Sequence, residues 1–329
     1  MSAVGEARVV TAARRGGRGS SLGGRVKTRL LIGGAWVLRH VPSGLAHRAA
    51  DLLGGILYRV QPARRALVRS NLERVVRYLA EHDMANDATA AAARDPRALD
   101  RLVRAAFGHW VRGYLESATL PAYASEKRLD HVRADDQDLV AQAFTPSKPA
   151  ALIVIGMHFG AIEIPGLWAT KRLGVRMTAP METIGDPALQ AYFERARSET
   201  GMNVIPVAGA ASALRNALER TETVALVADR PIGGSGISVE LFGAPARLPA
   251  GPAVLALESG APAWLIVTRR VGWSEYRSRL ERIEAPAGDS RRERLAAFMA
   301  AEARAFERAV ADAPEQWWTV FFPIWSAAS

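Results

Sequence analysis

Hydrophobic positions recur at two different spacings along the chain, and the spacing changes near residue 149. Before that point, apolar residues return every three or four positions, which is typical of amphipathic helices. This spacing predicts helices over residues 45–60, 62–80 and 95–120, and residues 82–96 are expected to form a mobile link or a helical turn. Beyond residue 149, short apolar runs alternate with helical stretches. The strands expected there are 150–156, 175–180, 203–207, 223–228, 237–242, 262–270 and 275–284, and the helices are 160–173, 187–200, 209–220, 249–259 and 290–312.

Short apolar strands that alternate with helices predict an α/β fold with a mixed, largely parallel sheet flanked by helices on both faces. An amino-terminal helical section precedes it. We expect a disordered basic tail over residues 1–26, a helical membrane-associating section over 27–140, and an α/β core over 141–329. The last two sections are expected to form one continuous globular unit.

The candidate site begins where the strand over residues 150–156 ends. His158 follows this strand directly, and Glu163 lies near the start of the next helix. On a single helix a spacing of five residues would point the two side chains about 140° apart, whereas a strand, turn and helix allow them to face each other. Asp229 follows another strand, and the carboxyl ends of parallel strands meet at one edge of a sheet. The pattern therefore predicts a cleft at that edge.

Charge is distributed unevenly along the chain. Residues 1–80 contain 15 basic and 3 acidic side chains, whereas residues 81–329 contain 28 and 30. A basic amino-terminal section suits either an anionic membrane surface or a nucleic acid. Its arginines alternate with aliphatic residues at helical spacing, and no zinc-finger, RRM or KH signature accompanies them, which favours a membrane. For the helices over residues 45–60 and 62–80, packing on the rest of the protein is the alternative.

Several classes of site find no support in the sequence. The chain has no cysteine, so disulfides, thiolate metal sites and cysteine nucleophiles are excluded. There is no G-x-S-x-G elbow of a serine hydrolase, the 6 histidines lack metal-binding spacing, and no G-x-G-x-x-G follows a strand. We expect neither a bound metal nor a bound cofactor.

Two blocks of sequence carry a resemblance to a known family. The first is MHFGAIE at residues 157–163, and the second runs from 227 to 262 with Asp229-Arg230, a glycine-bearing loop, Phe242-Gly243 and the PAGP segment at 249–252. Together they resemble the bacterial lipid A biosynthesis acyltransferases, which include phosphatidylinositol mannoside acyltransferases and belong to the wider glycerolipid acyltransferase superfamily. The resemblance extends from about residue 42 to residue 325.

The resemblance implies a membrane-associated O-acyltransferase. A fatty acyl chain would pass from acyl-CoA or acyl carrier protein, a donor substrate rather than a cofactor, to a hydroxyl of a glycolipid such as a lipid A precursor or a mannosylated phosphatidylinositol. His158 would be the general base and Glu163 would orient it. The expected location is the cytoplasmic face of the cell membrane, on anionic lipid, as a monomer that binds no nucleic acid.

Further substrate-binding residues are expected from the same resemblance. Arg197 would bind a phosphate, with a helix-face arginine as the alternative. Asp229 would hold Arg230 against a substrate phosphate or oxyanion, or the two would simply cap a turn, and Gly233 and Gly236 would let the backbone approach the ligand.

The chain also departs from the family pattern. Ala161-Ile162 replaces the usual Asn-Trp before the acidic residue, and residues 177–182 lack the usual arginine. A catalytically degenerate relative that binds lipid or a partner enzyme is therefore the alternative function.

Overall fold

The computed structural model describes residues 32–37, 40–120, 129–144, 151–231, 236–284 and 288–325. The expected basic tail over residues 1–26 and the candidate Gly233 lie outside these ranges. Strands are β1 (Val132–Ala134), β2 (Leu152–Gly156), β3 (Met177–Met181), β4 (Met202–Pro206), β5 (Thr223–Val227), β6 (Ile237–Leu241), β7 (Ala244–Leu248), β8 (Ala263–Arg270) and β9 (Tyr276–Ile283). Helices are α2 (Ser43–Val60), α3 (Pro62–Glu81), α4 (Asp87–Arg94), α5 (Pro96–Ala118), α8 (Gln137–Ala143), α9 (Ile164–Arg172), α10 (Pro187–Ser198), α11 (Ala210–Glu219), α12 (Gly251–Ser259) and α13 (Arg291–Asp312).

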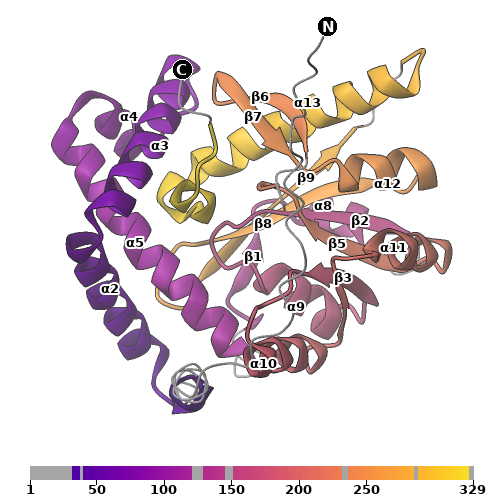
Figure 1. Ribbon diagram of the computed structural model, residues 1–329, viewed down its shortest axis with the longest axis horizontal. Coiled ribbons are helices and arrows are strands. Elements are labelled where there is room, and N and C mark those ends of the chain that lie inside the picture. The colour runs from indigo at the N-terminus through magenta and orange to yellow at the C-terminus, as the bar shows by residue number, and fades with distance from the viewer. Residues whose placement is uncertain are drawn as a thin grey trace, which may run out of the picture.

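A seven-stranded sheet in the order β1-β9-β8-β2-β5-β3-β4 forms the centre of the molecule (Figure 1). All neighbouring strands of this sheet run parallel except β8 and β9, which are antiparallel. The α/β fold with a mixed, largely parallel sheet is thereby confirmed. Helices α11, α12 and α13 contact one face of the sheet, and α8 and α9 contact the strands on the other.

The expected strands begin and end within two residues of the predicted positions. The structure differs from the prediction in three other places. β6 and β7 form a separate antiparallel hairpin outside the main sheet, and the sequence did not predict β7. The helix expected from residue 160 begins only at Ile164, because Gly160 adopts a left-handed conformation with φ of 52°. β1 lies inside the section expected to be helical and pairs with β9.

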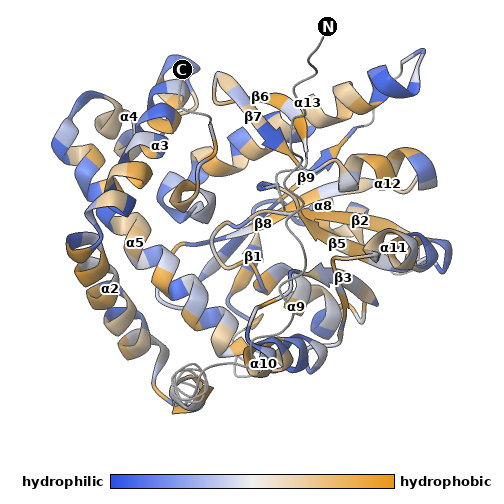
Figure 2. Ribbon diagram, viewed as in Figure 1, coloured by the Kyte–Doolittle hydropathy of each residue, from blue (hydrophilic) through white to orange (hydrophobic). Residues whose placement is uncertain are grey.

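The amino-terminal helices use their apolar residues in opposite ways. α3 turns its large apolar side chains inward, and Val68, Leu72 and Val75 are each 0% exposed. α2 instead packs on α5 through small residues, and Gly54 meets Gly108 so closely that a Cβ on Gly54 would lie 2.6 Å from the Gly108 Cα. Figure 2 shows α2 as a largely hydrophobic helix at the edge of the molecule. Leu57 packs against the core, whereas five other large apolar residues of the helix are exposed: Leu45, Leu52, Leu53, Ile56 and Val60.

Several arginines of α3 contact neighbouring aromatic side chains. Arg64 lies over Trp110, Arg65 over Tyr58 and Arg74 over Trp325, at 5.2 to 5.3 Å from the ring centroids. α3 therefore packs on the rest of the protein, which was the alternative expected for the helix over residues 62–80. No helix in the described part of the chain is both long enough and apolar enough to cross a membrane.

Glu302 of α13 is buried in the core, and neither of its carboxyl oxygens has a hydrogen-bond partner among the described residues. Burial raises the pKa of this carboxyl well above its usual value, because the apolar surroundings disfavour the charged form. An unfolded glutamate is ionised at neutral pH, so the raised pKa of the folded state lowers the stability of the fold there.

We therefore expect Glu302→Met to stabilise the protein at neutral pH. Since the folded pKa lies above the unfolded one, the wild type is penalised least below about pH 4.3 and increasingly as the pH rises. The difference in the free energy of unfolding between variant and wild type, from urea titrations at several pH values, should grow by about 1.4 kcal/mol per pH unit above that point. A difference that is independent of pH would contradict a protonated Glu302.

Candidate active site

The turn after β2 presents His158 at the carboxyl edge of the sheet. A Cβ on Gly160 would lie 2.0 Å from the Thr268 carbonyl oxygen, so only glycine allows the chain to pass here. The turn is also tied to the carboxy-terminal segment, because the Trp318 amide donates to the His158 carbonyl at 2.7 Å and the Gly160 amide donates to the Gln316 carbonyl at 2.9 Å. The position of the imidazole is thus fixed by contacts on both sides.

Asp229 is the carboxylate that orients His158. Its Oδ1 lies 2.8 Å from His158 Nδ1, and its Oδ2 accepts the His158 backbone N–H at 3.1 Å. Because a carboxylate only accepts, Nδ1 carries the proton in the neutral ring, and Nε2 is the nitrogen left for a substrate. β2 and β5 are neighbours in the sheet, which is why residues so distant in sequence meet.

The Asp229 carboxylate is completely enclosed. The side chain has 0% exposure, and Oδ2 also accepts from Trp317 Nε1 at 2.8 Å and from Thr319 Oγ1 at 2.6 Å. Burial pushes the pKa of Asp229 upward, but the charge of the His158 imidazolium and the hydrogen bonds from His158, Thr319 and Trp317 outweigh it, so the pKa lies below its usual value. Asp229 therefore remains ionised beside the histidine.

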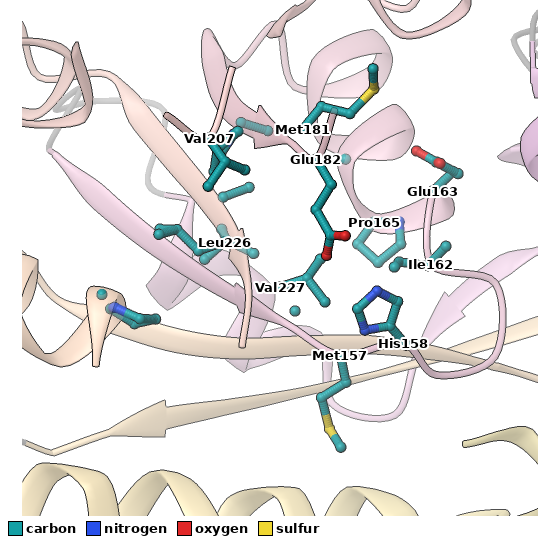
Figure 3. A pocket seen from close by; sticks show the side chains of 18 of the residues that line it. Met157, His158, Ile162, Glu163, Pro165, Met181, Glu182, Val207, Leu226 and Val227 are labelled. Carbon is teal, nitrogen blue, oxygen red and sulfur yellow. The ribbon is translucent and has the colours of Figure 1, made fainter. Parts of the chain in front are cut away.

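Glu163, expected to orient His158, instead pairs with Arg197. Arg197 Nη2 donates to Oε1 at 2.6 Å and Nε donates to Oε2 at 3.3 Å, which gives a two-pronged ion pair between the start of α9 and α10. Figure 3 shows the Glu163 carboxylate turned away from the imidazole. The expected pairing of His158 with Glu163 is thus replaced by His158 with Asp229, since the turn at Gly160 places Glu163 farther along the cavity wall.

A cavity of about 700 Å³ opens beside His158 (Figure 3). Its polar residues gather at the sheet edge, where Arg230 Nη2 donates to Glu182 Oε1 at 2.8 Å and the Arg230 guanidinium lies 4.6 Å from the Phe322 ring centroid. Arg197 also lines this cavity. The remaining lining is mostly apolar and comes mainly from β2, β3, β4, β5 and β8, from the start of α9, and from α5, α10, α11 and α12.

The other expected site residues lie at different positions. Arg230 is paired with Glu182 rather than with Asp229. Gly236 lies at the start of β6 with φ of 148°, and a Cβ there would lie 2.8 Å from the Leu248 carbonyl oxygen, so its glycine serves the hairpin. Across the described ranges, no cluster of three side chains suitable for binding a metal is found.

Two parts of the site were missed by reasoning from sequence. Glu182 follows directly after β3, so the rule that selected His158 and Asp229, namely position after the carboxyl end of a strand, would have selected it too. Trp317 and Thr319 carry no such signal, because they reach Asp229 from the other end of the chain.

A second buried network supports the turn that carries His158. Arg270 Nε donates to Glu116 Oε1 at 2.8 Å, and Arg270 Nη2 donates both to Glu116 Oε2 and to the Gly160 carbonyl, the latter at 2.8 Å. Tyr276 donates to the same carboxylate at 3.3 Å, and His47 Nε2 of α2 lies 3.9 Å from it. The network links α2 and α5 to the turn.

The fold and this site define a class of protein: an α/β enzyme fold in which a histidine, oriented by a buried carboxylate, opens onto a largely apolar cavity. The model of the bacterial lipid A biosynthesis acyltransferase family matches residues 23–325. The chain therefore belongs to this family of acyltransferases, as the sequence resemblance indicated.

Curated relatives include two phosphatidylinositol mannoside acyltransferases. The one from Mycolicibacterium smegmatis is 30% identical over 166 residues, which cover 49% of this chain and 54% of the relative. The one from Mycobacterium tuberculosis is 33% identical over 108 residues, which cover 32% of this chain and 34% of the relative. The matched part thus spans about half or a third of each relative's length.

Proposed function

We propose that this protein transfers a fatty acyl chain from a thioester donor to a hydroxyl of a glycolipid, with His158 as general base and Asp229 as the residue that orients it. The observation that carries the proposal is the hydrogen bond from His158 Nδ1 to a carboxylate with 0% exposure, beside an apolar cavity of about 700 Å³. An imidazole held in this tautomer is suited to removing a proton from a hydroxyl.

In the proposed reaction, His158 Nε2 takes the proton of the acceptor hydroxyl while the oxygen attacks the thioester carbonyl carbon. The tetrahedral intermediate then collapses, the carbon–sulfur bond breaks, and the imidazolium returns the proton to the leaving thiolate. Ile162, just before α9, and Pro165 in its first turn line the cavity, so the positive end of this helix adjoins the cavity in which the oxyanion would form. The apolar lining accepts the acyl chain.

Arg230 is the proposed partner for a phosphate of the donor or of the acceptor headgroup. Its guanidinium lies at the cavity and is neutralised by Glu182, whose side chain is 47% exposed. A phosphate that displaces Glu182 would take over a cation already held in place against Phe322. Arg197 is less accessible to a ligand, because Glu163 engages it through two nitrogens.

The acceptor is proposed to be a mannosylated phosphatidylinositol, in line with the relatives that the chain matches, with a lipid A precursor as the other candidate. To test this, purified protein is incubated with labelled acyl-CoA or acyl carrier protein and each acceptor, with the His158→Ala variant as the blank. A labelled product from only one acceptor, absent from the blank, is expected. No product with any pair, or equal product from the blank, overturns the proposed function.

The alternative of a degenerate relative that only binds lipid has less support. The substitutions at Ala161 and Ile162 lie beside the histidine, yet the contacts that orient the imidazole come from Asp229, Trp317 and Thr319. They do not depend on the missing Asn-Trp pair.

We further propose that α2 lies on a lipid surface and brings the cavity to its substrate. Leu52 and Ile56 are 69% and 46% exposed on its outer face, an unusual arrangement for large apolar residues of a water-facing helix. The small residues of α2 meet α5, so the helix holds these exposed apolar side chains away from the protein.

The double substitution Leu52→Asp and Ile56→Asp is expected to weaken binding to vesicles of anionic phospholipid at least about tenfold, since each apolar side chain contributes about 1.5–3 kcal/mol when buried. Co-sedimentation measures the effect. Leu173→Asp, at another exposed apolar position beyond the end of α9, is the control and should bind as the wild type does. Unchanged binding of the double variant would contradict a lipid-facing α2.

A further inference from the structure

Small residues form a channel in the part of the cavity that lies between the sheet and α9. Along this face of the sheet, the pair Val154 and Ala225 of β2 and β5 and the pair Ala179 and Val204 of β3 and β4 all line the cavity. Strand positions buried on both faces of a parallel sheet normally carry larger β-branched or aliphatic side chains. The two alanines leave room beneath the helix, and we call this space the acyl channel.

The acyl channel ends at two methionines. Two residues earlier on each strand, β3 and β4 pair Met177 with Met202, and both line the cavity. Of the described strand residues that line it, these two lie farthest from the carboxyl edge. Met181, at that edge, is four residues from Met177, which corresponds to a depth of about 13 Å at 3.3 Å per residue.

Gly166 of α9 faces the same end from the helix. A Cβ on this residue would lie 3.0 Å from the Met202 sulfur and 3.5 Å from the Met177 sulfur. Glycine inside a helix costs about 1 kcal/mol relative to alanine, and α9 has only 9 residues. Gly166 has an ordinary helical conformation rather than a positive φ, so the backbone does not require it. The close approach of α9 to the two methionine sulfurs does.

We propose that Gly166, Met177 and Met202 set the length of the acyl chain that the enzyme transfers. This inference rests on the proposed function. A chain that enters beside His158 runs along the alanines and stops where its terminal methyl group meets the two thioether side chains and the uncovered helix backbone. Methionine suits such an end, because its unbranched side chain fills irregular space and adapts to its neighbours.

Two substitutions should change the chain length in opposite directions. Met202→Ala removes most of one wall at the end of the channel and makes room for a longer chain. Gly166→Val pushes the two methionine side chains toward the channel and favours a shorter one. Met299→Ala is the matched control, because Met299 of α13 is 0% exposed in the core and is not among the residues that line the cavity.

The experiment measures kcat/KM for a series of saturated acyl-CoA donors of increasing length, with one acceptor, for the wild type and the three variants. The ratio of kcat/KM for the longest donor to that for the shortest should rise at least about tenfold in Met202→Ala and fall at least about tenfold in Gly166→Val. Met299→Ala should lower the melting temperature and leave the ratio unchanged. Shifts in the expected directions support the inference.

Ratios that stay at the wild-type value in both Gly166→Val and Met202→Ala overturn it, and if only their melting temperatures fall, Gly166 merely permits close packing of α9. If the wild type transfers no chain from any donor, the proposed function fails, and binding of the same donors by calorimetry then decides the inference separately. The longest donor that still binds should become longer in Met202→Ala and shorter in Gly166→Val. Equal limits in all proteins overturn the inference.

Discussion

Replacing His158 with alanine is expected to lower kcat for acyl transfer by about 10²–10⁴, the usual contribution of a general base. The substitution removes the only imidazole among the residues that line the cavity, while the fold should survive because the His158 side chain is 27% exposed and its backbone bonds remain. Initial rates with labelled acyl-CoA measure the loss, and KM for the donor should change little, since the ring contributes no acyl-binding surface of note.

Asp229→Asn should cause nearly the same loss, and the double variant of His158 and Asp229 should be no worse than either alone. An amide at this position presents a donor as well as an acceptor, so the tautomer with a free Nε2 is no longer enforced. Residues that act as a unit are strongly non-additive, which the double variant tests directly.

Glu163→Gln is the comparison that separates the two acids. Since Glu163 engages Arg197 rather than His158, we expect it to lower kcat much less than Asp229→Asn does. If Glu163→Gln is as inactive as His158→Ala while Asp229→Asn keeps its activity, then Glu163 and not Asp229 orients the base.

The second large effect is expected in stability, from Glu116. The Arg270 side chain is 1% exposed, and the Glu116 carboxylate neutralises its guanidinium. Glu116→Leu would remove this carboxylate. Removing one partner of a buried ion pair costs about 3–5 kcal/mol, whereas replacing both with apolar residues is often close to neutral. Glu116→Leu should therefore be severely destabilised in urea, and adding Arg270→Met should restore most of the free energy of unfolding.

The matched control is an exposed pair. Glu73 and Arg77 of α3 lie 3.3 Å apart with side chains 52% and 63% exposed, and Glu73→Ala should change the free energy of unfolding by only about 0.5 kcal/mol. A double variant of Glu116 and Arg270 that is as unstable as the single one would show that the pair is needed for more than mutual neutralisation, because Arg270 also donates to the Gly160 carbonyl.

The sequence was sufficient to predict six of the seven strands of the sheet, because β2 and β8 contain short apolar runs and β9 alternates buried and exposed positions. The short strand β1 was missed, because its three residues carry no such pattern. The sequence was equally sufficient to place His158 and Asp229 at one edge, since the rule for parallel strands needs only the order of strands and helices. β7 was missed because it alternates buried and exposed residues over only 5 positions and contains a proline.

Which acid faces His158 could not be predicted, for a physical reason. The choice between Glu163 and Asp229 depends on which strands are neighbours and on a left-handed turn at Gly160, and neither leaves a periodic signal in the sequence. The orientation of α2, with small residues on α5 and large apolar residues exposed, could not be predicted for a related reason. A helical period shows that one face is apolar but not whether small or large residues meet the protein.

Three distant segments complete the site: the turn at His158, the end of β5 at Asp229, and Trp317 with Thr319 close to the carboxy terminus. Contacts between residues so far apart in sequence form late in folding, because the entropy of closing a long loop is lost before the contact stabilises the chain. On the ribosome, a chain that has emerged only as far as α13 contains the base and its acid but lacks the two donors that hold the acid. We therefore expect the proposed chemistry to become available only once Trp317 and Thr319 have joined the fold.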